Sequence, residues 1–463
     1  MPIDLSGQDS LVEAGSITIQ IKNTHPLMLL ANALPWSKLI QLIVDDLKLS
    51  TNKGFWWMGR KIKVRMHLAA YLLQRIYNLT DRKLEYQIKD NAAFQIFCGS
   101  QFVHGWHAPD HTKIEEFRNR LSPETARALA NAIAQTAVDF GFSDPRHVDF
   151  DSTVQEANMA YPSDASLMTK LSGLGKKVVD FVSEKFSRLL PENLSVDMKA
   201  VKSLAREYFF LPKNKSIEIR REVFKKLHTL VKHQVKPVVQ FCEELTDKQI
   251  TQLPWNIKRA YQQIKDDAWR YLLDVGHFTR AHTIKSGKIL SFHAKAVKCI
   301  KKGKVGKDFE FGRVFQLGRI KGNFLFVLES TSVEMSDKTS FIPLLAEHSN
   351  LFGKGMIETV ATDKGYWSAK NQGELIRLGI KTEGLQRPVN IKGKTGDKDL
   401  EERLRNRRAG IEPLIGHAKH GGQLGKSRMK SDTATLAAGY GSILGLNLRQ
   451  LTRYQQGKVK VAL

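Results

Sequence analysis

Three acidic residues of this sequence stand where carboxylates can do chemistry together. Asp151 lies in a segment with strand character, Asp363 follows a later one, and Glu412 lies in the basic stretch RRAGIEPLIGHAKHG. Acids at strand ends occupy the edge of an open sheet where ligands usually bind. Clustered carboxylates repel one another and shift toward protonation, and divalent cations remove that conflict. The three side chains are therefore candidate metal ligands.

Mg²⁺ suits such a set, with Mn²⁺ as the substitute. It takes oxygen ligands at roughly 2.0–2.1 Å and keeps several waters, so a few carboxylates can hold two ions. Two ions can activate a water or hydroxyl and stabilise the leaving oxygen of an in-line phosphoryl displacement. The expected cofactor is a pair of these ions, and the matching substrate is a phosphodiester.

The chain is strongly basic. Its 463 residues carry 72 Lys and Arg against 47 Asp and Glu, a formal net charge of +25. The excess of positive charge is spread along the chain. This distribution favours a broad surface that binds a phosphate backbone over a solvated basic arm. Nucleic acid is thus the first partner to consider, and a merely soluble basic protein is the alternative. The segment SGLGKK departs from the phosphate-loop pattern, so no nucleotide cofactor is expected.

Targeting signals and cysteine pairs are not evident. The N-terminus has no basic region followed by an apolar one, and no stretch approaches about 18 uninterrupted apolar residues. We therefore expect a cytoplasmic chain outside the membrane. Cys98, Cys242 and Cys299 form no C-x-x-C pair and are predicted to be small buried side chains.

The elements that must position the acids begin after a helical N-terminal region, residues 1–140. In IKVRMHLAAYLLQRIYNLTDRKLEYQIKD, apolar side chains recur every three or four positions, and the NLTD break offers Thr80 or Asp81 as a helix N-cap. Two helices joined by so short a turn fit a DNA-binding helix-turn-helix, and they fit a simple helical bundle as well.

A strand is expected at HVDFDSTV. Val148 and Phe150 face one way, and Asp149 and Asp151 face the other. Alternation does not decide which of the two aspartates binds a metal.

Basic helices are expected over residues 166–286. There WNIKRAYQQIKDDAWRYLLDV predicts an amphipathic helix of about five turns. Its apolar face comprises Ile257, Tyr261, Ile264, Ala268, Tyr271 and Val275.

Strand patterns return after Lys288. ILSFHAKAVKCI, FEFGRVFQLGRI and NFLFVLESTSV predict an antiparallel meander, followed by a helix from Ser336 or Asp337 and a strand ending at Asp363. The order predicts an α/β core, 141–165 plus 287–463, interrupted by the all-α block 166–286. The turn KKGKVGK offers lysines equally plausible as phosphate contacts or as a solubilising tip, namely Lys301, Lys302, Lys304 and Lys307.

Four segments, in order, closely resemble the DDE transposases of bacterial insertion sequences: VDFDSTVQEANMAYPSDASL, CIKKGKVGKDFEFGRV, VATDKGYWSAKN and RRAGIEPLIGHAKHGG. The resemblance covers nearly the whole chain. The closest group has an InsH-like N-terminal domain before an RNase H-like catalytic domain. The resemblance implies a multidomain α/β fold: a helical DNA-binding domain, then an RNase H-like mixed sheet flanked by helices and interrupted by the all-α insertion.

Carried over residue by residue, the family's two catalytic aspartates fall on Asp151 of DST and Asp363 of TDKGY, and its glutamate falls on Glu412. All three would be metal ligands. The non-catalytic alternatives to metal binding are an Asx-turn cap for Asp363 and a surface ion pair for Glu412.

The family's tail signature, Y-x2-R-x3-E-x6-K, is met by Arg408, Glu412 and Lys419, whereas Arg405 replaces its tyrosine. One helix would place the three matching residues on one face, with the cations free to position DNA. Because Pro413 suits only a first turn, the alternative is a helix that begins at Glu412.

The resemblance also implies partners and a reaction. The enzyme would cut the terminal inverted repeats of its own element in double-stranded DNA and join the 3′-OH to target DNA. A homodimer or larger synaptic assembly, nucleoid-associated in a bacterial cytoplasm, would be required. The alternative is a non-catalytic DNA-binding protein derived from a transposase.

Overall fold

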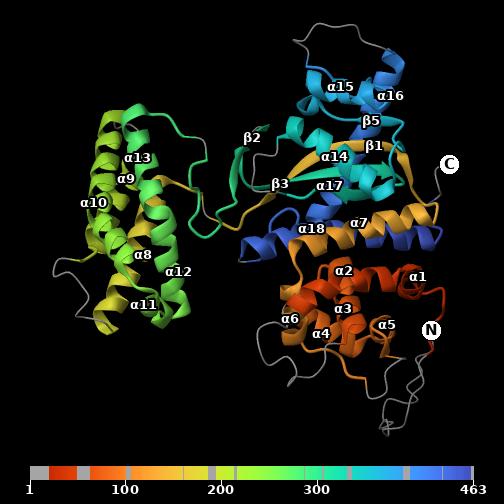
Figure 1. Cartoon of the computed structure of the whole chain (residues 1–463), viewed down its shortest axis with the longest axis horizontal. Helices are drawn as coiled ribbons and strands as arrows, with labels where there is room; N and C mark the ends of the chain where they lie inside the picture. The colour runs from red at the N-terminus through yellow and green to blue at the C-terminus, as the bar shows by residue number, and fades with distance from the viewer. Residues whose placement is uncertain are drawn as a thin grey trace, which may run out of the picture. The chain divides into compact units, whose positions relative to one another are not determined.

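The computed structural model describes residues 20–49, 63–100, 106–159, 161–185, 194–212, 216–285, 287–304, 307–330, 336–388, 397–429 and 431–459. They form a mostly helical α/β structure with a mixed sheet, which confirms the predicted combination (Figure 1). Contacts divide the chain into two compact units. The first unit is Met1–Thr153, Phe315–Gly425 and Leu436–Leu463, and the second unit is Val154–Val314 and Lys426–Thr435.

Helices fill the N-terminal part of the first unit. Asn78, with a left-handed backbone at φ 50°, ends α3, and Thr80 caps α4 by accepting from the Lys83 N–H at 3.3 Å. The predicted pair of helices with a short turn is confirmed, with Thr80 as the cap. The helices are α1 Pro26–Ala33, α2 Trp36–Leu49, α3 Val64–Tyr77, α4 Asp81–Asp90, α5 Ala92–Phe97, α6 His111–Arg120 and α7 Pro123–Asp139.

The described strands form a five-stranded sheet in the order β2-β3-β1-β5, with β4 paired to β3 outside this path. β1 and β5 are parallel, with Val148 opposite Val360, and β3 is antiparallel to both β2 and β4. The antiparallel meander and the strand before Asp363 are therefore confirmed. The strands are β1 Asp144–Glu156, β2 Lys298–Lys304, β3 Lys307–Lys321, β4 Phe324–Val327 and β5 Thr359–Ala361.

The first meander strand begins only at Lys298, later than its pattern predicts. The Ser291 hydroxyl accepts from the backbone N–H groups of His293 and Ala294 at 3.4 and 3.3 Å. Such a local turn takes up the donors that a strand would offer to its neighbour. The side chains of the four turn lysines, Lys301, Lys302, Lys304 and Lys307, lie outside the described residues.

The alternation predicted for β1 is confirmed. Val148 and Phe150 are fully buried, and the Phe150 ring packs edge-on against Phe326 at 6.3 Å between ring centres. Asp149 and Asp151 lie on the opposite face, where Asp149 is also buried. Burial of an acid requires partners, which for Asp149 come from segments beyond residue 300.

Helices after the meander complete the first unit. Ser336 caps α14 by accepting from the Thr339 N–H at 3.3 Å, which confirms the predicted helix start. These elements are α14 Asp337–Phe352, the 3₁₀ turn η6 Lys364–Tyr366, α15 Ala369–Arg377, α16 Lys398–Ala409, α17 Ile411–His420 and α18 Asp432–Gln455.

Two asparagines close the free edge of β4. Asn131 of α7 accepts from the Val327 N–H at 2.9 Å and donates to its carbonyl at 3.2 Å. Asn447 of α18 does the same at Leu325, at 3.0 and 2.7 Å, and also donates to the Ala130 carbonyl of α7 at 3.0 Å. α7 and α18 therefore lie side by side against the sheet (Figure 1), and the edge has no open backbone at these residues.

The second unit contains a helical block with a core of its own. The six apolar positions predicted for its amphipathic helix are all buried. That helix is continuous in the chain, with a π-helical segment, η5, between α12 and α13. The elements are α8 Asp164–Lys185, α9 Met198–Phe210, α10 Ile217–Glu244, α11 Asp247–Gln252, α12 Trp255–Gln263, η5 Ile264–Ala268 and α13 Trp269–Ala281.

Two expectations drawn from composition have different outcomes. Cys98 and Cys242 are buried as predicted, whereas Cys299 is exposed, because it lies on β2 at the end of the strand order. Among the described residues, no single helix is long and apolar enough to cross a membrane, and the bent pair Pro26–Ala33 and Trp36–Leu47 passes by length and composition alone.

Candidate active site

Consecutive arginines of α16 bind the two aspartates of β1 separately. Asp149, only 1% exposed, accepts from Arg319 Nε at 2.9 Å and from Arg407 Nε at 2.8 Å. Asp151 accepts from Arg408 Nη1 at 3.3 Å. A buried carboxylate between two guanidinium groups is fully partnered. Asp149 therefore has a structural role, and Asp151 faces the candidate site.

Arg408 joins Asp151 to Glu412. Its second terminal nitrogen lies 2.7 Å from Glu412 Oε1. The Glu412 side chain is 62% exposed, whereas those of Arg408 and Asp151 are 18% and 15% exposed. The structure thus brings these three predicted residues together. Glu412 forms an ion pair, which was the alternative to its predicted role as a metal ligand.

Arg408 and Glu412 lie on two helices that are separated at Gly410. α16 ends at Ala409 and α17 begins at Ile411. The prediction of one helix through Arg408, Glu412 and Lys419 is therefore wrong, and the alternative, a helix that begins next to Glu412, is correct. Pro413 then lies in the first turn, where a proline is tolerated. A methyl group at Gly410 would clash with the Arg319 guanidinium.

Asp363 directly precedes η6 and caps it. Its Oδ1 accepts from the Gly365 N–H at 2.9 Å, so the Asx-turn alternative is present in the structure. Burial and the charge of Asp337 raise the pKa of Asp363, and Arg408 opposes them. Burial likewise raises the pKa of Asp151 to about 6, against the charge of Arg408 and with contributions from Asp363 and Asp337. The aspartates and Arg408 therefore share one electrostatic site.

Asp337 is a carboxylate of this site that the sequence analysis treated only as a helix start. Its Oδ1 accepts from Gln316 Nε2 at 2.9 Å, and Gln316 Oε1 accepts from the Tyr366 hydroxyl at 2.6 Å. A methyl group at Gly365 would lie 2.9 Å from Asp337 Oδ2 and 3.0 Å from Asp363 Oδ1. The two carboxylates thus flank the same glycine. The adjacency depends on long-range packing, and no local signal in the sequence marks it.

Two of the predicted ligands fit a hard cation. Asp151 and Asp363 supply oxygen donors, and their raised pKa values mean that a cation would stabilise the charged forms. Glu412 is paired with Arg408 instead, and no group of three or more His, Cys, Asp or Glu side chains in the described ranges is placed to hold a metal ion. Lys419 lies about two turns beyond Glu412 on α17 and is partly buried.

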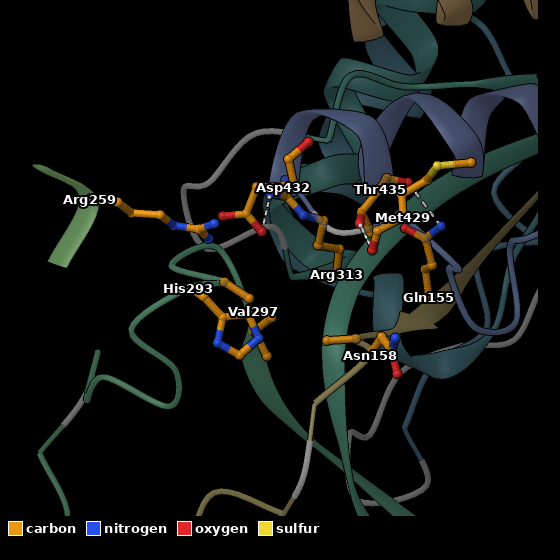
Figure 2. A pocket seen from close by; sticks show the side chains of 12 residues that line it. Gln155, Asn158, Arg259, His293, Val297, Arg313, Met429, Asp432 and Thr435 are labelled. Carbon is orange, nitrogen blue, oxygen red and sulfur yellow. Dashed lines mark hydrogen bonds and ion pairs between the residues drawn. The ribbon is translucent and has the colours of Figure 1, made fainter. Parts of the chain in front are cut away.

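A pocket of about 240 Å³ lies in the second unit (Figure 2). Arg313 pairs with Asp432 in it at 3.3 Å, and Arg259 and His293 also line it. Burial, with the charges of Lys170 and Arg259, lowers the pKa of His293. The charge of Asp432 opposes them, and the lining includes none of the predicted site residues.

Residues 16–120, which include α1 to α6, match the protein family described as Transposase domain (DUF772). A similar protein is the uncharacterized protein ORF8 in the nfe locus of Rhizobium meliloti, 26% identical over 155 residues, 32% of this chain and 70% of that protein. No solved structure matches the chain. The family match supports an insertion-sequence transposase. Its residues precede Asp151, Asp363 and Glu412.

Proposed function

We propose that the chain is a Mg²⁺-dependent DDE transposase that cuts the ends of its own insertion sequence and joins the 3′-OH to target DNA. The observation that carries this proposal is the cluster of Asp151, Asp363 and Glu412 about Arg408, two of them paired with it at 3.3 and 2.7 Å. The transposase-domain match supports the same class of protein. The proposed catalytic fold is RNase H-like, built on the mixed sheet that carries Asp151.

Asp151 and Asp363 are the proposed first ligands of Mg²⁺ or Mn²⁺, and Glu412 is the proposed third. When bound, two such ions would activate the attacking water or 3′-OH and stabilise the leaving oxygen. An exposed ion pair contributes only about 0–1 kcal/mol. Because Glu412 is held by such a pair, its carboxylate can leave Arg408 at small cost.

Arg408 and Lys419 are the proposed DNA-positioning residues. Released from the carboxylates, the planar Arg408 guanidinium can donate two parallel hydrogen bonds to a phosphate. Helices α3 and α4, joined at Thr80, are the proposed helix-turn-helix for the terminal repeats. Joining two ends to one target requires at least two copies of the chain, acting at the nucleoid.

The test incubates purified protein with labelled duplex DNA spanning the flanks of its gene, with Mg²⁺ or with EDTA, beside Asp363→Asn. We expect metal-dependent nicks at discrete flank positions that the variant loses. Tight binding without cleavage, equal in both proteins, would instead establish the non-catalytic DNA-binding protein derived from a transposase. Circular dichroism of the variant shows whether it is folded.

A further inference from the structure

Helices α10 and α13 of the second unit pack antiparallel. Lys232 of α10 lies with its Nζ 5.8 Å from the ring centre of Trp269, at the start of α13. Phe224, two turns earlier in α10, meets Phe278, near the end of α13, at 6.1 Å between ring centres. The exposed sides of the two helices therefore form one continuous surface.

The α10 part of this surface is a stripe of lysines. Lys225, Lys232 and Lys236 are exposed and spaced by seven and four residues, which places them on one side of a helix. Among the described residues, none of the three forms an ion pair. Lys226 points elsewhere on the same helix and is paired with Glu222 at 2.8 Å. The stripe thus keeps its charge uncompensated where a neighbouring lysine does not.

The α13 part adds apolar surface and a further cation. Trp269 is 38% exposed and Leu273 is 46% exposed, and Arg280 is exposed on the same side of the helix. Burial lowers the pKa of His228, as do the charges of Lys232 and Arg280, whereas the hydrogen bond to the Leu272 carbonyl and the charge of Asp164 raise it. Cations from both helices therefore lie near the same histidine.

We propose that this α10–α13 face binds the phosphate backbone of double-stranded DNA. The face is defined by Lys225, Lys232, Lys236, Trp269, Leu273 and Arg280. From Lys225 to Lys236 the stripe runs along about 16 Å of helix axis at 1.5 Å per residue. A duplex presents one phosphate charge per roughly 1.7 Å of its own axis, so several phosphates can meet the stripe at once.

Such contacts hold DNA independently of its sequence, because side chains that reach phosphates read no base edges. The all-α block would then contribute a DNA contact of its own to the proposed function. The identity of the partner rests on the proposed function, whereas the place of the contact rests on the geometry of α10 and α13.

The test measures the affinity of the full chain for a fluorescent duplex of arbitrary sequence across about 50–200 mM salt. One variant combines Lys225→Gln, Lys232→Gln and Lys236→Gln. The matched control combines Lys176→Gln, Lys185→Gln and Lys226→Gln, three exposed lysines of the same unit that are paired with acids. Both variants lower the net charge equally, and thermal unfolding shows that each is folded.

We expect the face variant to bind about tenfold more weakly and its log–log salt slope to become shallower by about 2.7, which is 0.9 for each of three lost phosphate contacts. The control should keep the wild-type slope. Equal losses in both variants, or no loss in the face variant, overturn the proposal and leave the transposase proposal standing if the wild type binds. A wild type that binds no duplex at any salt overturns both.

Discussion

Arg407 binds the buried carboxylate of Asp149 at 2.8 Å, and this ion pair determines where the next residue of α16 lies. Arg407 also donates to Thr359 Oγ1 of β5 at 2.6 Å and to a carbonyl of β1 at 3.1 Å. With α16 tied to both strands, Arg408 reaches Asp151 on the same face of β1. The Asp149–Arg407 pair thus positions the candidate site, which lies two residues further along β1 and one residue further along α16.

Asp149→Asn is expected to destabilise the fold by about 3–5 kcal/mol, because it removes a buried carboxylate and leaves two partly buried guanidinium groups without their counterion. Urea unfolding measures the change. Asp144→Asn, which removes a carboxylate paired with the exposed Arg146, is the control and should cost much less. An Asp149→Asn protein as stable as the wild type would refute the anchoring role.

Gly410→Ala is expected to cost about 1–3 kcal/mol, since the added methyl must displace a guanidinium held by Asp149 and by the Arg407 carbonyl at 2.9 Å. Gly416→Ala is the matched control in the interior of α17, where a methyl meets nothing within 4 Å. It should stabilise the protein by about 0.5–1 kcal/mol, the usual gain in a helix. Two equal effects in urea unfolding would argue against a role for the close contact at Gly410.

Elements with a local signal were predictable from the sequence. The Thr80 and Ser336 caps, the apolar face of α12 and α13 and the alternation of β1 each depend on residues within a few turns of one another. The late start of β2 was missed because Ser291 makes a turn that alternation does not record. Periodicity therefore located the elements better than their ends.

Pairings between distant segments were not predictable. Asp149 and Asp151 share a strand face and a residue type, and they differ only in the arginines that reach them from beyond residue 300. Asp337 likewise gains its place beside Asp363 through Gln316 and the packing of α14. The family resemblance supplied Asp151, Asp363 and Glu412, but no motif pointed to Asp337.

Asp337→Asn is expected to shift the acidic limb of the pH–nicking profile to lower pH. The charge of Asp337 contributes to the raised pKa values of both Asp151 and Asp363, so its removal lets these carboxylates ionise at lower pH. The amide oxygen can still accept the hydrogen bond from Gln316, and thermal unfolding checks that the variant is folded. Glu374→Gln, on α15 and paired with Arg377 at 2.6 Å, is the control. An unchanged limb in a folded Asp337→Asn protein would contradict the electrostatic coupling.

Asp151→Asn is expected to remove part of the pH dependence of stability in metal-free buffer. Burial raises the pKa of Asp151 to about 6, above its value of about 3.9 in an unfolded chain. The folded state therefore holds this proton more tightly, and the resulting stability is fully present below about pH 4 and is lost as pH rises through about 6. The wild type should lose about 1–3 kcal/mol of stability through this group over that pH window, and the variant should not.

Urea unfolding at several pH values with EDTA measures the difference. Repeating the measurement with excess Mg²⁺ should restore stability to the wild type at high pH, since a ligand of the folded state stabilises it. Parallel pH curves for the two proteins would show that the carboxyl of Asp151 ionises freely, and Mg²⁺ stabilisation equal in both would remove Asp151 from the proposed ligands.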